Sequence, residues 1–102
     1  MSTVRKLNES ALRGIYDAYM HEAFPPAELK PLAVMLRLME RGRYLCYGYY
    51  RNGRLAAYAF FYRHDSRVLL LDYFAVTPEL RGRGVGSAFL AALDAVLGGV
   101  CI

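Results

Sequence analysis

The sequence predicts a mixed α/β domain of the α+β type, in which a strand and two helices precede a three-stranded antiparallel meander. Three observations lead to this prediction. Apolar residues recur at helical spacing within residues 8–41, β-favouring aromatic and branched residues fill residues 44–76, and a glycine-rich turn at residues 81–87 precedes a last amphipathic segment. Because 102 residues support one hydrophobic core, residues 1–102 are expected to form a single domain.

The first predicted elements are a short strand at residues 4–7 and a helix capped by Asn8. The apolar residues of this helix recur at helical spacing and are Leu12, Ile15, Tyr16, Tyr19 and Met20. Residues 23–26 then break the pattern, because proline lacks an amide hydrogen and restrains the residue before it. A connection is therefore expected there.

A second helix is expected to run to about Arg41, with Pro31 near its first turn and Gly42 at its end. One apolar stripe follows it, made of Leu32, Met35, Leu36 and Met39. This stripe predicts that the helix packs against the same core as the first one.

Residues 44–50 and 54–63 are predicted to pair as a hairpin around Asn52-Gly53, a sequence that favours two-residue turns. After a polar turn, residues 68–76 are apolar except at Asp72, which is typical of a strand covered on both faces. Three antiparallel strands are therefore expected to follow the two helices.

The last predicted helix follows the glycine-rich turn and ends at Gly98-Gly99. Its apolar face is expected to comprise Val85, Phe89, Ala92, Leu93 and Val96. Residues 100–102 look like the opening of a further strand, so the chain is expected to end within its fold.

Composition excludes several classes of protein. The longest apolar run, residues 55–62, is far shorter than the roughly 20 residues that span a bilayer, and the N-terminus lacks an export signal, so a cytoplasmic location is expected. Cys46 and Cys101 have no metal or redox spacing, and the two histidines lie far apart, so no metal is expected. The net charge of +4 comes from scattered residues, which does not indicate nucleic-acid binding.

The sequence Arg81-Gly82-Arg83-Gly84-Val85-Gly86-Ser87 follows a predicted buried strand and opens a helix. Glycine allows positive φ and close backbone approach, and a helix N-terminus offers free N–H groups and partial positive charge, so this turn suits a diphosphate. Neither a P-loop nor a dinucleotide fingerprint matches. The alternative is a tight turn that only packs the helix on the strand.

Residues 71–86 resemble the signature of the GNAT N-acetyltransferases, Arg/Gln-x-x-Gly-x-Gly/Ala after a strand that ends in Ala-Val. Arg81, Gly84 and Gly86 match its fixed positions, and the predicted order of elements also fits the family. The resemblance implies transfer of an acetyl group from acetyl-CoA to a primary amine of a small molecule, peptide or protein.

The family resemblance also implies a cofactor site. The amides of the turn, Arg81, Gly82, Arg83, Gly84, Val85, Gly86 and Ser87, would bind the coenzyme A pyrophosphate. The end of the preceding strand, Phe74, Ala75 and Val76, would pair with the pantetheine arm. The Val76 amide would then polarise the thioester carbonyl.

Asp72 is the candidate catalytic base, because it is the one charged residue within the apolar strand. Its even spacing from Val76 predicts that both side chains share one strand face. The alternative is a structural carboxylate bonded to a neighbouring amide or tyrosine. Glu22, Phe24 and Glu28 lie at the connection where the family commonly binds its acceptor, although solvated surface charge also explains the two glutamates.

Complete family members continue with further strands, so the C-terminal strands are expected to be missing here. The strand at residues 68–76 and the stub at residues 100–102 would then form an exposed apolar edge, which favours a homodimer. The alternative function is a non-catalytic module that binds acyl-CoA or assembles with itself.

Overall fold

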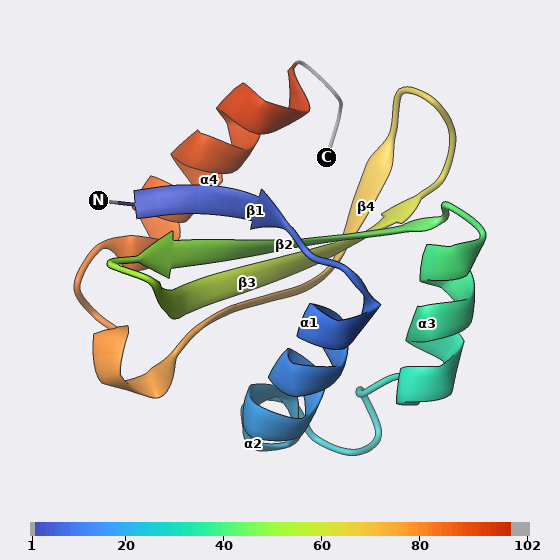
Figure 1. Ribbon diagram of the computed structural model, residues 1–102, viewed down its shortest axis with the longest axis horizontal. Coiled ribbons are helices and arrows are strands. Elements are labelled where there is room, and N and C mark those ends of the chain that lie inside the picture. Colours follow the sequence, from blue (N-terminus) through green and yellow to red (C-terminus); the bar gives the residue numbers. More distant parts are fainter. Residues whose placement is uncertain (1, 99–102) are drawn as a thin grey trace.

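The computed structural model describes residues 2–98. Its four strands form one antiparallel sheet in the order β1-β2-β3-β4. The three helices before the meander cover one face of this sheet, and α4 covers the other (Figure 1). The predicted mixed α/β fold is thereby confirmed.

The elements are β1 (Ser2–Lys6), α1 (Glu9–Ile15), the π-helix η1 (Tyr16–Met20), α2 (His21–Ala23), α3 (Leu32–Glu40), β2 (Tyr44–Arg51), β3 (Arg54–Arg63), β4 (Leu69–Val76), the 3₁₀ turn η2 (Pro78–Leu80) and α4 (Val85–Leu97).

The predicted N-cap of the first helix is confirmed, because the Asn8 side chain accepts a hydrogen bond of 2.9 Å from the Ala11 amide. The first strand begins two residues earlier than predicted and ends before Leu7, whose amide still donates to the Cys46 carbonyl. Helical structure continues without a break from α1 through η1 into α2. The apolar residues of this stretch therefore stay on one face.

The hairpin between β2 and β3 is confirmed. Asn52 and Gly53 both have positive φ, 52° and 81°, which matches the right-handed twist of the strands that they join. Arg51 pairs with Arg54 across this turn. The meander that follows is the centre of the molecule, because buried side chains from both of its faces form the two core clusters.

β4 contains one residue more than its partner strand over the paired segment. Phe60 pairs with Tyr73 and Phe61 pairs with Leu71, so Asp72 is left as a β-bulge. The prediction that this strand is covered on both faces is wrong. Leu70 and Leu71 are 49% and 44% exposed, because β4 is the last strand of the sheet formed by the described residues.

The last helix packs on the sheet through Val85, Phe89 and Leu93, as predicted. Val96 was expected on the same face but is 52% exposed, whereas Leu97, the next residue of α4 (Figure 1), packs against the core. Gly98 ends the helix with a φ of 59°. The rest of the predicted stop at Gly99 and the strand stub at residues 100–102 lie outside the described residues. No helix within residues 2–98 is long and apolar enough to cross a membrane.

Candidate functional site

The glycine-rich turn connects the end of β4 to the start of α4 (Figure 1). Gly82 and Gly84 have φ values of 78° and 75°, and an added Cβ at either residue would meet no atom within 4 Å. Their backbone is therefore open to a ligand. Gly84 caps α4 without any side-chain hydrogen bond, so the first amides of the helix are not capped by a side chain.

The outer edge of β4 lies beside this turn. The Thr77 amide donates to the Ala56 carbonyl of β3, so the peptide groups of Thr77 face the sheet. Because peptide groups alternate along an antiparallel strand, those of Val76 face outward. The Arg81 Nε donates to the Val76 carbonyl from this side at 3.2 Å. The predicted diphosphate turn and the predicted pantetheine edge therefore lie next to each other.

Side chains of the turn divide into buried and exposed ones. Val85, the first residue of α4, is buried against the sheet, so only its backbone could contact a ligand, whereas Arg83 and Ser87 are exposed. Gly86 lies over β4, where an added Cβ would be 3.6 Å from Val76 and 3.7 Å from the Phe74 ring. The start of α4 therefore lies close to the end of the strand.

Phe74 and Ala75, at the end of β4, point to opposite faces of the sheet. The Phe74 ring stacks on Phe89 with centroids 5.5 Å apart, and Phe89 in turn stacks on Tyr49 at 5.1 Å. Ala75 packs on the opposite face, in the core formed with the first helices. This aromatic stack links β2, β4 and α4 and so orients the helix whose N-terminus forms the turn.

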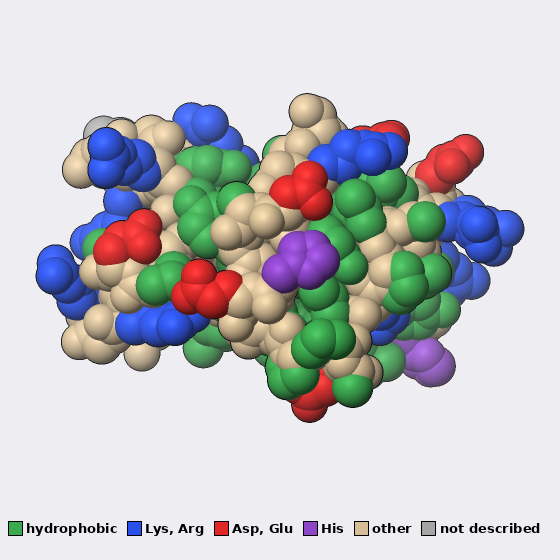
Figure 2. All heavy atoms as spheres, turned by 90° about the horizontal axis from the view of Figure 1, so that it is seen from below, with side chains coloured by type: hydrophobic (Ala, Val, Ile, Leu, Met, Phe, Trp, Pro, Cys, Tyr) green, Lys and Arg blue, Asp and Glu red, His purple; other side chains and the backbone are tan. Residues whose placement is uncertain are grey.

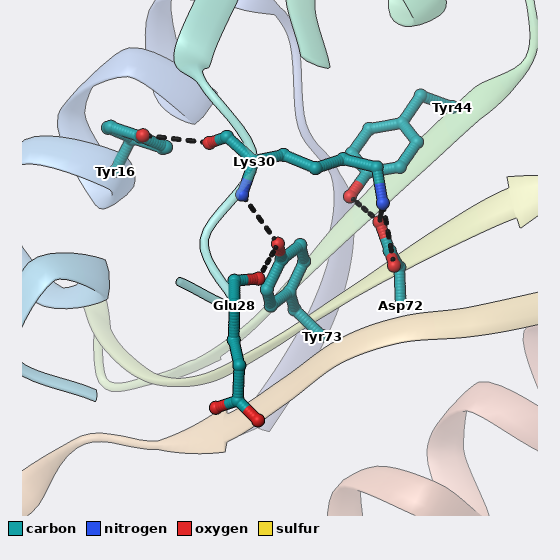
Figure 3. A network of polar contacts seen from close by, with 6 residues as sticks. All are labelled: Tyr16, Glu28, Lys30, Tyr44, Asp72 and Tyr73. Carbon is teal, nitrogen blue, oxygen red and sulfur yellow. Dashed lines mark hydrogen bonds and ion pairs between the residues drawn. The ribbon is translucent and has the colours of Figure 1, made fainter. Parts of the chain in front are cut away.

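The bulge in β4 places Asp72 in a polar network on the face covered by the first helices (Figure 3). Its carboxylate accepts hydrogen bonds from Tyr44 Oη at 2.5 Å and from Lys30 Nζ at 3.0 and 2.8 Å. The prediction that Asp72 and Val76 share a strand face is wrong. The bulge breaks the alternation, so Asp72 faces Tyr44 whereas Val76 packs against the α4 side.

The same network holds residues 28–30 against β4 (Figure 3). Tyr73 Oη donates to the Glu28 carbonyl at 2.7 Å and accepts from the Lys30 amide at 2.8 Å. Tyr16 Oη donates to the Lys30 carbonyl at 2.8 Å. Three elements far apart in the sequence, η1, the segment before α3 and β4, therefore meet at Lys30.

The predicted acceptor residues are only partly brought together. The Phe24 ring contacts Tyr73 edge-on, with centroids 4.9 Å apart, so Phe24 lies beside the network. Glu28 contributes its backbone carbonyl, while its carboxylate points away from the network (Figure 3). Glu22 is exposed in α2, and its charge adds a smaller contribution to burial in raising the pKa of Tyr58.

Burial sets the protonation of two tyrosines of this face. Burial, together with the hydrogen bond to Asp72, raises the pKa of Tyr44 far above its ordinary value. Burial raises the pKa of Tyr58 to about 12, with Arg81 acting against this shift. Both hydroxyls therefore keep their protons at neutral pH. Among residues 2–98, the hydroxyls of Tyr58 and Thr77 are the buried side-chain oxygens without a hydrogen-bond partner.

Sequence reasoning missed Lys30. It is one of two lysines in the chain, which is a weak signal, and its partner Asp72 lies 42 residues away. In the sequence, Tyr44 and Tyr73 stand among the aromatic residues that predict the strands within residues 44–76. No local pattern predicts that they meet at one carboxylate.

The fold and the turn together define a class: α/β domains that have a glycine-rich turn between the last strand of a meander and a helix. Within this class, residues 10–99 match the family model described as "Acetyltransferase (GNAT) family", which covers most of the chain. The chain therefore belongs to the GNAT acetyltransferase family.

Solved structures agree with this assignment. The ribosomal-protein-S18-alanine N-acetyltransferase from Escherichia coli is 26% identical, with a TM-score of 0.70 over 95% of this chain and 59% of that one. A GNAT-family protein from Bacteroides thetaiotaomicron is 19% identical, with a TM-score of 0.80 over 94% of this chain and 56% of that one. The chain thus spans somewhat more than half the length of these two proteins.

A predicted acetyltransferase from Clostridium acetobutylicum, solved with acetyl-CoA, is 14% identical, with a TM-score of 0.67 over 94% of this chain and 73% of that one. At this identity the likeness shows the fold alone. No curated protein sequence matches the chain significantly.

Proposed function

We propose that this chain acts as an N-acyltransferase, transferring an acetyl group from acetyl-CoA to a primary amine of a small molecule, peptide or protein. The observation that carries the proposal is the open glycine turn, which joins the outward-facing edge of β4 to the uncapped N-terminus of α4. A diphosphate and an extended amide chain would need these two features side by side. Membership of the GNAT family supports the same reaction.

In this proposal the backbone amides from Arg81 to Ser87 hold the diphosphate, and the guanidinium groups of Arg81 and Arg83 add charge. Residues 74–76 pair with the pantetheine arm along the edge of β4. The outward-facing Val76 amide donates to the thioester carbonyl and stabilises the negative charge that develops there. Arg81 must then exchange its contact with the Val76 carbonyl for the ligand.

The acceptor side is proposed to lie on the face of the first helices. An alkylammonium with a pKa of about 10 must lose a proton before its nitrogen attacks the thioester carbon, and Asp72 is the proposed proton acceptor. The new C–N bond forms as the C–S bond breaks, and the second proton of the amine nitrogen goes to the leaving thiolate, which departs as the free thiol. Glu22, Phe24 and Glu28 are proposed to contact the acceptor.

Calorimetric titration with acetyl-CoA tests the cofactor site. The double variant Arg81→Ala/Gly84→Glu is expected to bind at least about tenfold more weakly than the wild type, because it removes charge-assisted contacts and places an anion in the turn. The exposed and remote Arg41→Ala is the matched control. Equal affinity in all three proteins would contradict the proposal.

Turnover separates the enzyme from its alternative. Amine-dependent release of the coenzyme A thiol, lost in the same double variant, is the expected result. Saturable binding without release for any primary amine would instead favour a non-catalytic module that binds acyl-CoA or assembles with itself.

A further inference from the structure

Asp72, Tyr44 and Tyr73 form a binding site for an ammonium group, and Lys30 supplies that group in the structure (Figure 3). The Lys30 Nζ bridges both carboxylate oxygens of Asp72, at 3.0 and 2.8 Å, and lies 5.8 Å from the centroid of the Tyr73 ring. The Tyr44 hydroxyl fixes the carboxylate from another direction. A carboxylate beside an aromatic ring is the chemistry that recognises an organic cation. These three residues are called the ammonium site below.

The side chain of Lys30 is not needed to hold its own segment in place. Its amide and carbonyl are bonded to Tyr73 and Tyr16, both at 2.8 Å, and the neighbouring Glu28 carbonyl is bonded to Tyr73 at 2.7 Å. All three bonds use the backbone of the segment. The segment can therefore stay attached to β4 while the ammonium leaves.

The ion pair is also accessible to solvent. The side chains of Lys30 and Asp72 are 37% and 22% exposed, and partly exposed ion pairs contribute little to stability. A released lysine side chain regains rotamer freedom and the hydration of its charge. Replacing Lys30 by another ammonium therefore costs little.

We propose that Lys30 holds the place of the acceptor, whose primary ammonium displaces Lys30 from Asp72. This inference rests on the proposed function, because it takes the acceptor to be a primary amine, the same chemical group that Lys30 presents. The displaced side chain moves into solvent while its backbone keeps its bonds to the two tyrosines. Lys30 thereby competes with the acceptor for Asp72. An uncharged molecule has no ammonium group to pair with the carboxylate, so it does not displace Lys30.

NMR on protein labelled at the lysine Cε tests displacement directly, because the chain has only Lys6 and Lys30. The probe is butylammonium chloride, without acetyl-CoA, and butan-1-ol is the uncharged control. The Lys30 signal is expected to move saturably toward its position in the Asp72→Asn variant, where the partner charge is gone. The signal of Lys6, exposed on β1, should not move.

Affinity gives the second test. Lys30→Met is expected to bind butylammonium up to about fivefold more tightly than the wild type, because a partly exposed ion pair no longer competes. Lys6→Met should bind like the wild type, and Asp72→Asn should lose saturable binding. Binding is followed by the ring signals of labelled tyrosines, and thermal melting verifies that each variant is folded.

Three results would overturn the inference: no saturable movement of the Lys30 signal, equal movement of both lysine signals, or binding to Lys30→Met that is no tighter than to the wild type. The wild-type titration decides the matter even if a variant fails to fold. A protein that binds acetyl-CoA but ignores butylammonium would refute the ammonium site and leave the proposed function standing. Displacement of Lys30 without acetyl-CoA binding would refute the proposed cofactor site and leave the ammonium site standing.

Discussion

Two buried tyrosine hydroxyls of the same core cluster contribute very differently to the molecule. Tyr44 donates to Asp72 at 2.5 Å, whereas the Tyr58 hydroxyl has no partner among residues 2–98. A buried hydroxyl loses its hydrogen bonds to water on folding, and only a partner in the protein compensates for that loss. The ring of Tyr58 therefore stabilises the core, and its oxygen does not.

Removing each hydroxyl tests this difference. Tyr44→Phe is expected to lower the free energy of unfolding by about 1–3 kcal/mol, because Asp72 loses a hydrogen bond to its charge. Tyr58→Phe is expected to be neutral or stabilising, because it removes an unsatisfied group and leaves the ring in place. Urea unfolding of the two variants and the wild type measures both effects. A similar loss in the two variants would show that Tyr58 has a partner after all.

At the scale of elements, local chemistry could be predicted from the sequence. Asn8 as an N-cap and Asn52-Gly53 as a hairpin turn each depend on residues within a few positions, and both are confirmed. The bulge at Asp72 depends on how β4 aligns with β3, which no residue of β4 specifies alone. For that reason the predicted strand face of Asp72 is wrong.

In the candidate site too, features that depend on neighbouring residues could be predicted, and features that depend on the complete fold could not. The turn from Arg81 to Ser87 is continuous in the sequence, so its glycines and its helix could be recognised directly. The network around Lys30 joins residues 14 to 45 positions apart, and its contacts depend on the complete fold. Periodicity likewise puts Val96 on the buried face of α4, yet Val96 is exposed while Leu97 packs against the core, because burial depends on how the helix sits on the sheet.

The glycine turn is the element whose backbone can be tested by single substitutions. Gly84→Ala is expected to cost about 1–2 kcal/mol of stability, because its φ of 75° forces a side chain into the left-handed region. Gly86→Ala is the matched control, since its φ is not positive and its new Cβ would make ordinary contacts of 3.6–3.7 Å. Thermal unfolding should show a loss in the first variant alone. Equal losses would mean that close packing, and not φ, requires these glycines.

On the scale of the whole molecule, the two sides of the sheet end differently. β1 forms one edge with the mostly polar sequence Ser-Thr-Val-Arg-Lys, and β4 forms the other with Leu70 and Leu71 exposed. Figure 2 shows another view, from below, in which basic and acidic side chains are interspersed among apolar ones, without a single stripe of basic charge on this face. An apolar strand edge is a more specific surface for association than this mixed charge.

Self-association through β4 is therefore expected at micromolar concentration. Leu71→Lys should shift the protein toward the monomer, because a charged edge strand disfavours pairing with another chain. Exposed Val34→Lys, on α3, is the matched control and should leave the association unchanged. Sedimentation velocity measures all three proteins. A wild type that sediments strictly as a monomer would contradict the expectation.

Because Asp72 is a bulge, β4 could be one residue shorter and still pair with β3. Every pair that β4 makes with β3 on either side of Asp72 would keep its partner and its face if that residue were deleted, because Leu71 and Tyr73 already oppose adjacent residues. The ladder therefore does not need residue 72, and only the polar network does. Family members that are one residue shorter here are expected to keep the sheet and to lack a lysine at the position of Lys30.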